Sequence, residues 1–268
     1  MAWQNAFIIL REKDVSMAMP HDAPSFPAGV SLSSASGSAV PSPSLVQLLT
    51  TARQNYTWPL KSGHVPSQKK IIALEQTVAG LLSSLNVSSA HQIIIEVSSW
   101  AGNYKPSHTR IVQASAADKQ AMLAAIQMCL SPTGCRAGLN ALSRLPGISL
   151  IIASKIFRFV RPLTGAAVDR HASYFFNSLA VTGRGTAFVR EWPTKARKTS
   201  RLATYSNSRL LINLDEYVDV YLPLLGDIST FMNVNNTFSC PVTHQTKTWT
   251  PADVEMAAYY WWACNGAR

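Results

Sequence analysis

The sequence predicts an all-α protein, and three observations support this class. Between residues 44 and 268, apolar residues recur at the three- and four-residue spacing of helices that bury one face. We find no strand-rich segment and no internal repeat. Because 47% of the 268 residues are hydrophobic, the chain can bury a full core, either as one larger domain or as two small lobes.

Residues 1–43 are predicted to form a flexible or loosely ordered N-terminal extension. Residues 1–15 fit a short helix or a strand equally well, and residues 16–43 are rich in proline, serine and alanine. Such a composition buries too little apolar surface to offset the chain entropy that is lost on ordering. The folded domain is therefore expected at residues 44–268.

The first helices of this domain are expected at residues 44–54, 66–85, 91–101 and 116–130. In the second, Ile71, Leu74 and Val78 lie on one stripe, which indicates a helix with one buried face. The third runs into a polar and aromatic junction at residues 98–104.

The rest of the chain is arranged around residues 139–171. An apolar helix at the start of this stretch is ended by Pro146 and Gly147, because proline cannot continue the helical hydrogen bonds and glycine can adopt a positive φ. A second apolar helix at residues 150–160 leads to a short turn with one carboxylate, Asp169. We expect Asp169 to cap the following helix, because aspartate accepts hydrogen bonds from the amides of a first turn.

The C-terminal helices are expected at residues 170–179, at residues 206–225 and from Thr250 onward. Thr250 occupies the N-cap position of the last helix, Pro251 its first helical position, and Asp253 the acidic position of a capping box. The aromatic residues of this helix are expected to pack against the rest of the fold.

The net charge of +10 is concentrated in one segment of the chain. Half of the 24 basic residues, but only two of the 14 acidic residues, lie between Arg136 and Arg201, so the remainder is neutral. This distribution is typical of a protein that binds a phosphate backbone. The alternative is a solvated basic surface, which would normally spread its charge more evenly.

Residues 139–171 resemble the helix-hairpin-helix of the DNA glycosylase superfamily that includes endonuclease III, 8-oxoguanine glycosylase and the alkyl-base glycosylases. The resemblance rests on Leu-Pro-Gly-Ile-Ser at 145–149 and on Val-Asp-Arg-His at 168–171. The first motif alone is a weak signal, because Pro-Gly turns between helices are common. The two motifs together, at the spacing found in the family, are a strong signal.

The resemblance implies two helical lobes with an active-site cleft between them, a hairpin unit at 137–161 and a catalytic turn at 166–171. It implies a DNA glycosylase, which flips a damaged or modified base out of DNA and hydrolyses its N-glycosidic bond, leaving an abasic site. Asp169 would be the catalytic carboxylate, because it could stabilise the positive charge that builds on the sugar and position or deprotonate the attacking water.

Two departures from the family pattern bear on the reaction. Ser149 replaces the last glycine of the hairpin, and Ile151 occupies the position of the Schiff-base lysine in members that also cleave the strand. A monofunctional glycosylase is therefore expected. Lys155, one helical turn further on, is an alternative nucleophile that would make the enzyme a bifunctional glycosylase and lyase. A third reading is a non-catalytic helix-hairpin-helix protein that only binds DNA.

The resemblance also implies contacts to DNA. Backbone amides at Gly147 and Ser149 would face a phosphate at a helix N-terminus, and the hairpin carbonyls of 145–149 could hold K⁺ or Na⁺. Basic side chains would add attraction that does not depend on sequence; these are Arg144, Arg158, Arg161 and Arg170. Candidates for the base pocket, or for filling the gap left by the flipped nucleotide, are Trp100, Asn103 and Tyr104.

No cofactor is expected beyond such a cation. The four cysteines lack the close spacing that binds an iron–sulfur cluster in some relatives, and the histidines lack the spacing of metal ligands. The sequence contains no secretion signal that we recognise and no membrane-spanning run. We expect a cytoplasmic monomer, nucleoid-associated if bacterial, whose partner is DNA.

The excised base is not readable from the sequence. Relatives remove oxidised purines, alkylated bases, oxidised pyrimidines, mismatched thymine and modified cytosine. The absence of the lysine and of the iron–sulfur cysteines disfavours a close copy of endonuclease III. It leaves alkyl-base excision repair, or removal of a hypermodified phage cytosine in anti-phage defence, an option suggested by the N-terminal extension and the altered hairpin.

Overall fold

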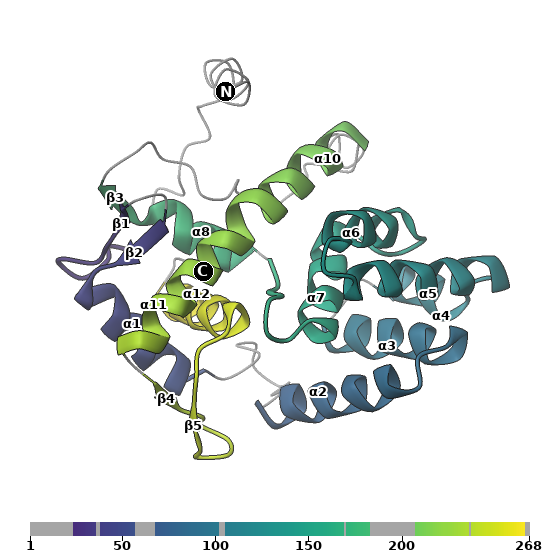
Figure 1. The fold of residues 1–268 in the computed structure, drawn as a ribbon, viewed down its shortest axis with the longest axis horizontal. Helices are drawn as coiled ribbons and strands as arrows, with labels where there is room; N and C mark the ends of the chain where they lie inside the picture. The colour runs from purple at the N-terminus through teal and green to yellow at the C-terminus, as the bar shows by residue number, and fades with distance from the viewer. Residues whose placement is uncertain are drawn as a thin grey trace.

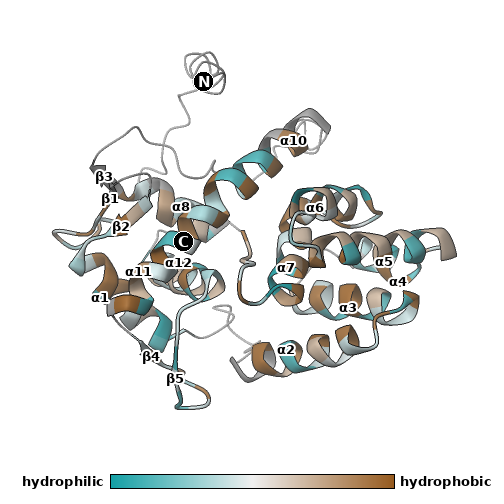
Figure 2. Cartoon of the chain, in the orientation of Figure 1, coloured by the Kyte–Doolittle hydropathy of each residue, from teal (hydrophilic) through white to brown (hydrophobic). Residues whose placement is uncertain are grey.

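The computed structural model describes residues 24–35, 38–56, 68–101, 105–168, 170–182, 207–235 and 237–265. Within these ranges the protein is mostly helical with a few short strands, which confirms the predicted class (Figure 1). Hydrophobic and hydrophilic residues alternate along the helices, as amphipathic packing requires (Figure 2). No helix in the described ranges is both long and apolar enough to cross a membrane.

A first group of helices is continuous in sequence and packs on itself. Its members are α2 (Gln68–Ser83), α3 (Val87–Trp100), α4 (Lys105–Val112), α5 (Ala116–Leu130), α6 (Cys135–Arg144) and α7 (Leu150–Val160). Helix α5 packs on α3 and α6, and α7 packs on α2, α3, α5 and α6. Ile94, Ile126 and Ile156 are fully buried between these helices. The predicted apolar stripes are thus the faces that meet in the core.

A second group of helices is assembled from both ends of the chain. It comprises α1 (Pro43–Gln54), α8 (Arg170–Ser178), α10 (Asn207–Glu216), the π-helical turn η1 (Tyr217–Tyr221), α11 (Leu222–Asn235) and α12 (Pro251–Asn265). Helix α12 packs on α1, α8 and α11. A buried ion pair of 2.9 Å between Arg53 Nε and Asp253 Oδ1 joins α1 to α12. Figure 1 shows the two groups on opposite sides of the α7–α8 connection.

The capping box predicted at the start of the last helix is confirmed. The Thr250 amide donates to Asp253 Oδ2 at 3.0 Å, and the Asp253 amide donates to Thr250 Oγ at 3.3 Å. Asp253 therefore caps α12 and pairs with Arg53 at the same time, so this helix end is fixed against α1.

The described part of residues 1–43 differs from the predicted flexible extension. β1 (Ser31–Ala35) pairs antiparallel with β2 (Ser38–Pro41) and parallel with β3 (Ala180–Thr182). Leu32 is only 1% exposed, and the Ala39 amide donates to Asp227 in α11 at 2.9 Å. β1 and β2 are neighbours in sequence, but β3 and Asp227, which hold them against the rest of the fold, lie far away in the chain, and local composition could not reveal them. Residues 1–23 lie outside the described ranges.

Other elements also depart from the predicted ones. A second small sheet pairs β4 (Phe238–Ser239) with β5 (Thr246–Lys247) before α12. Helix α4 was not predicted, because it is short and carries no apolar stripe; its Ile111 is nevertheless fully buried. The helix predicted at 206–225 continues through η1 into α11 and ends ten residues later, at Asn235.

The turn between α6 and α7 has the geometry that its sequence predicts. The Ile148 amide donates to the Leu145 carbonyl at 3.1 Å across Pro146 and Gly147. Gly147 has φ +82°, and a Cβ at this position would lie 2.3 Å from the Ser107 carbonyl oxygen of α4. Only glycine fits this left-handed position and the close approach of α4.

We expect Gly147→Ala to lower the free energy of unfolding by about 2–3 kcal/mol, because alanine is strained at this φ and its Cβ collides with α4. Gly80→Ala in α2 is the control. A Cβ there meets no atom within 4 Å, so alanine should stabilise the helix by about 0.5–1 kcal/mol. Urea unfolding followed by circular dichroism measures both variants. An unchanged unfolding free energy for Gly147→Ala would contradict the stated fit of the turn.

Candidate functional site

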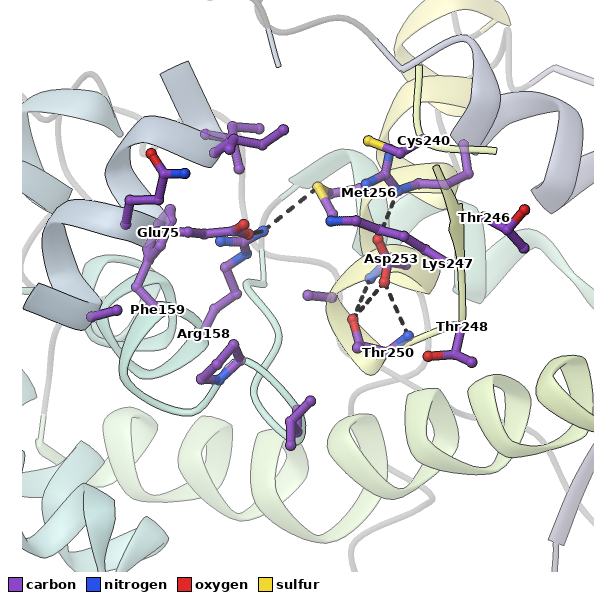
Figure 3. A pocket seen from close by; sticks show the side chains of 18 of the residues that line it. Glu75, Arg158, Phe159, Cys240, Thr246, Lys247, Thr248, Thr250, Asp253 and Met256 are labelled. Atoms are coloured by element: carbon purple, nitrogen blue, oxygen red, sulfur yellow. Dashed lines mark hydrogen bonds and ion pairs between the residues drawn. The ribbon is translucent and has the colours of Figure 1, made fainter. Parts of the chain in front are cut away.

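A cleft of about 680 Å³ lies where the two groups of helices face each other (Figure 3). On one side, α2 contributes Glu75, and α7 contributes Arg158 and Phe159. On the other side, β5 contributes Lys247, and α12 contributes Met256. This volume falls within the range of small-molecule and cofactor sites in proteins.

Arg158 forms part of the cleft wall. Its side chain is only 4% exposed, and Nη2 donates to Glu75 Oε1 at 2.7 Å and lies 3.9 Å from the sulfur of Met256. Among the described residues, its Nη1 is buried with no hydrogen-bond partner. The sequence led us to expect Arg158 on an exposed basic face, but its side chain is buried and does not add to such a face. Any ligand that it binds must enter the cleft.

A smaller recess, with room for only about 10 Å³, lies beside Arg158 and Met256. The other residues that line it come from six separate segments and are Tyr56, Ile71, Trp100, Lys155, Ala167 and Glu255. Lys155 is 7% exposed and Glu255 is 6% exposed, so the recess holds buried charges of both signs. It is almost closed, and a planar base would enter only if its walls moved.

Two aromatic side chains shape the recess. Trp100 packs edge-on against Phe159, with 5.1 Å between ring centroids, and the Lys155 ammonium lies 5.8 Å from the centre of the Trp100 ring. The pKa of Tyr56 is raised well above its usual value, mainly by burial and then by the charge of Glu255. Tyr56 is therefore a neutral phenol that faces a carboxylate.

Several predicted site residues lie outside the described residues. These are Asp169, Asn103 and Tyr104, together with the side chain of Arg170. The residues before Asp169 are described, and Ala166, Ala167 and Val168 are all buried. Ala167 lines the recess, so Asp169 is two residues along the chain from its wall.

Three side chains hold the backbone of this buried segment. Tyr217 and Tyr221 donate from their hydroxyls to the carbonyls of Ala166 and Ala167, the latter at 3.1 Å. The Val168 amide donates to Ser154 Oγ at 3.1 Å. Buried backbone groups outside regular structure need such partners. The segment that leads into Asp169 and α8 is therefore fixed from both groups of helices.

The π-helical turn η1 explains how both tyrosines reach this segment. Tyr217 and Tyr221 lie four residues apart and are almost completely buried. A π-helical turn is wider than an α-helical turn, and this brings positions four residues apart closer to one line along the helix. Single π-helical turns are frequent at functional sites.

The remaining predicted DNA contacts are divided between surface and core. Arg144 is exposed and donates to Asn140 at 3.1 Å within α6. Arg161 donates to the Leu130 carbonyl at 2.7 Å, so it caps the C-terminal end of α5. Ser149 is the N-cap of α7, with its hydroxyl 3.5 Å from the Ile152 amide. Ser149 thus stabilises the helix that follows it. Residues 183–206, which carry much of the basic charge, lie outside the described ranges.

The described residues provide no evident metal site, since no three histidine, cysteine or acidic side chains gather there. All four cysteines are free thiols. Burial raises the pKa of Cys129 to about 12, so this thiol is not a nucleophile at neutral pH.

Five residues of the site were not singled out from the sequence, namely Tyr56, Tyr217, Tyr221, Glu75 and Glu255. Glu255 lies in a helix whose residues are buried on almost every side, and an acid in such a context is a signal that could have been noticed. Nothing in the neighbouring sequence marks Tyr56, Tyr217 or Tyr221, because their roles arise from tertiary contacts.

Comparisons with protein-family models, curated proteins and solved structures find no match to this chain.

We expect Ser154→Ala to lower the free energy of unfolding by about 1–3 kcal/mol, because it leaves the buried Val168 amide without its acceptor. Ser143→Ala is a matched control in α6. The Ser143 hydroxyl is buried without a hydrogen-bond partner among the described residues, so its removal should be neutral or slightly stabilising. Thermal and urea unfolding compare the two variants. Equal losses in both would show that the Ser154 hydroxyl has no special role.

Proposed function

We propose that this protein is a monofunctional DNA glycosylase. The proposal interprets the two groups of helices as two lobes, α6 and α7 as a helix-hairpin-helix, and the space between the groups as the active-site cleft. It is supported most strongly by the position of α7. This helix begins at the Pro-Gly turn, contributes Lys155 and Arg158 to the cavities, and holds through Ser154 the segment that leads to Asp169.

In this proposal, each part of the site has a separate role. The turn at 145–149 binds a DNA phosphate through backbone amides, and basic residues add screened attraction along the strand. The target nucleotide leaves the duplex, at a cost of a few kcal/mol, and its base enters the recess beside Ala167. Asp169 faces the sugar, stabilises its developing positive charge and activates the water. The products are a free base and an intact strand with an abasic site.

A second candidate function, a glycosylase with lyase activity, is favoured by one observation. Lys155 lines the recess next to Ala167 and is almost fully buried there. Its neutral amine would attack C1′ of the flipped nucleotide and displace the base; opening of the sugar ring then gives a Schiff base, from which β-elimination of the 3′ phosphate cleaves the strand.

We expect Asp169→Asn to reduce base release by about 10²–10⁴-fold and to leave DNA affinity unchanged, because only the charge on the carboxyl group is lost. The assay incubates the protein with single strands and duplexes that carry modified bases, including phage DNA with modified cytosine, and detects abasic sites by alkaline cleavage. Glu96→Gln in α3 is the control for loss of one carboxylate. If wild-type protein releases no base from the whole panel, or if Asp169→Asn is fully active, the proposal is wrong.

Borohydride trapping separates the two candidate enzymes. A monofunctional glycosylase gives no covalent adduct with DNA, because no amine attacks the sugar. Lyase activity through Lys155 would give an adduct that disappears in Lys155→Met and persists in Lys119→Met, a control lysine in α5. An adduct with this pattern would show that the enzyme is a bifunctional glycosylase and lyase, and the proposal of a monofunctional glycosylase would be wrong.

A further inference from the structure

We propose that Arg158 recognises the excised base, by donating hydrogen bonds from Nη1 to a carbonyl oxygen of a neutral base. The class of substrate would then be neutral bases with an exocyclic carbonyl oxygen, such as oxidised bases, rather than bases without one, such as N-alkylated adenines. This inference rests on the proposed glycosylase function and names the substrate class of the same site.

The two terminal nitrogens of Arg158 differ in their hydrogen-bond partners. Nη2 is engaged by Glu75 and lies against the sulfur of Met256 (Figure 3). Nη1 is buried, and none of the described residues accepts a hydrogen bond from it. A buried donor without an acceptor costs about 1–3 kcal/mol. A base recovers this free energy only if it places an acceptor within reach of Nη1, and an exocyclic carbonyl oxygen, which projects from the ring and has two lone pairs, is better placed to do so than a ring nitrogen.

The position of Arg158 makes it a contact for any ligand of the site. It lines both the large cleft and the small recess, and so does Met256. A base that enters the recess therefore lies beside the guanidinium group, and a substituent that extends into the cleft lies beside it as well.

The charges around the recess favour a neutral base. Among the described residues that line it, Lys155 and Arg158 are cationic and Glu255 is anionic. Asp169, in the proposed function, faces the sugar, and Glu75 is occupied by Nη2. In a cavity of low dielectric constant these charges act strongly. The carboxylates of Glu75 and Glu255 balance the two cations, so these side chains offer no net negative charge to attract a cationic base, whereas a neutral base with a carbonyl oxygen can accept from Nη1.

The test is the affinity for duplexes that carry one modified nucleotide, made resistant to hydrolysis by a 2′-fluoro group. Neutral carbonyl-bearing bases are represented by 8-oxoguanine, 8-oxoadenine and 5-hydroxyuracil. Bases without a carbonyl are represented by 1-methyladenine, which is cationic, and 1,N6-ethenoadenine, which is neutral. A duplex with a tetrahydrofuran abasic site, which offers no base, reports the contacts to the backbone alone.

We expect wild-type protein to bind at least one carbonyl-bearing duplex about tenfold or more tightly than either carbonyl-free duplex. Arg158→Met should abolish this preference, and Arg158→Gln, which keeps an N–H donor, should retain part of it. Neither variant should alter affinity for the abasic duplex. Arg144→Met, which removes an exposed arginine, should keep the base preference of the wild type.

The inference is overturned if wild-type protein prefers carbonyl-free bases, if it shows no preference, or if the preference survives in Arg158→Met. Melting curves establish that the variants are folded, and Arg158→Gln decides the matter if Arg158→Met does not fold. Because the readout is binding, it does not depend on base release. Failure of the glycosylase reaction and failure of base recognition by Arg158 are therefore observed separately.

Discussion

The structure depends on the hydrogen bonds that side chains make to the backbone between α7 and α8. Residues 166–168 are buried and belong to no helix or strand, so their polar groups need partners from elsewhere. Ser154 supplies one partner from the first group of helices, and Tyr217 and Tyr221 supply two from the second. These bonds fix the direction in which α8 begins and hold the two groups against the same three residues. This segment, whose Ala167 lines the recess, is thus a point at which the two groups of helices are joined.

The second group of helices is complete only when elements near the two ends of the described chain pack together. Helix α12 packs on α1, and β1 receives β3 from residues about 150 positions later in the chain. The first group, in contrast, is built from consecutive helices with short connections. Local contacts form early in folding and distant ones late. The cavities between the groups are therefore completed by contacts of long sequence separation, and their charged residues come from segments that are unrelated in sequence.

The sequence was sufficient for elements whose causes are local. The apolar stripes, the capping box at Thr250 and the turn at Gly147 each follow from residues within one or two helical turns. It was not sufficient for β1, β2 and the π-helical turn, because their partners lie in other parts of the chain. At the candidate site, the burial of Lys155 and Arg158 was hidden for the same reason. Arg158 was predicted to bind DNA and Lys155 to be an alternative nucleophile, and the enclosure of both side chains by α2, α3 and α12 depends on tertiary packing.

One ion pair network has a further consequence for the relation between the two groups. Arg136 of α6 pairs with Asp219 at 2.5 Å and also with Asp215, and this links the first group to α10 and η1. The pKa of Arg136 is raised mainly by its hydrogen bond to Asp219, and both carboxylates are largely exposed to solvent. At physiological ionic strength, mobile ions screen such exposed charges beyond about 8 Å and weaken closer pairs. Added salt therefore weakens this link between the two groups, whereas the buried hydrogen bonds to residues 166–168 are screened much less.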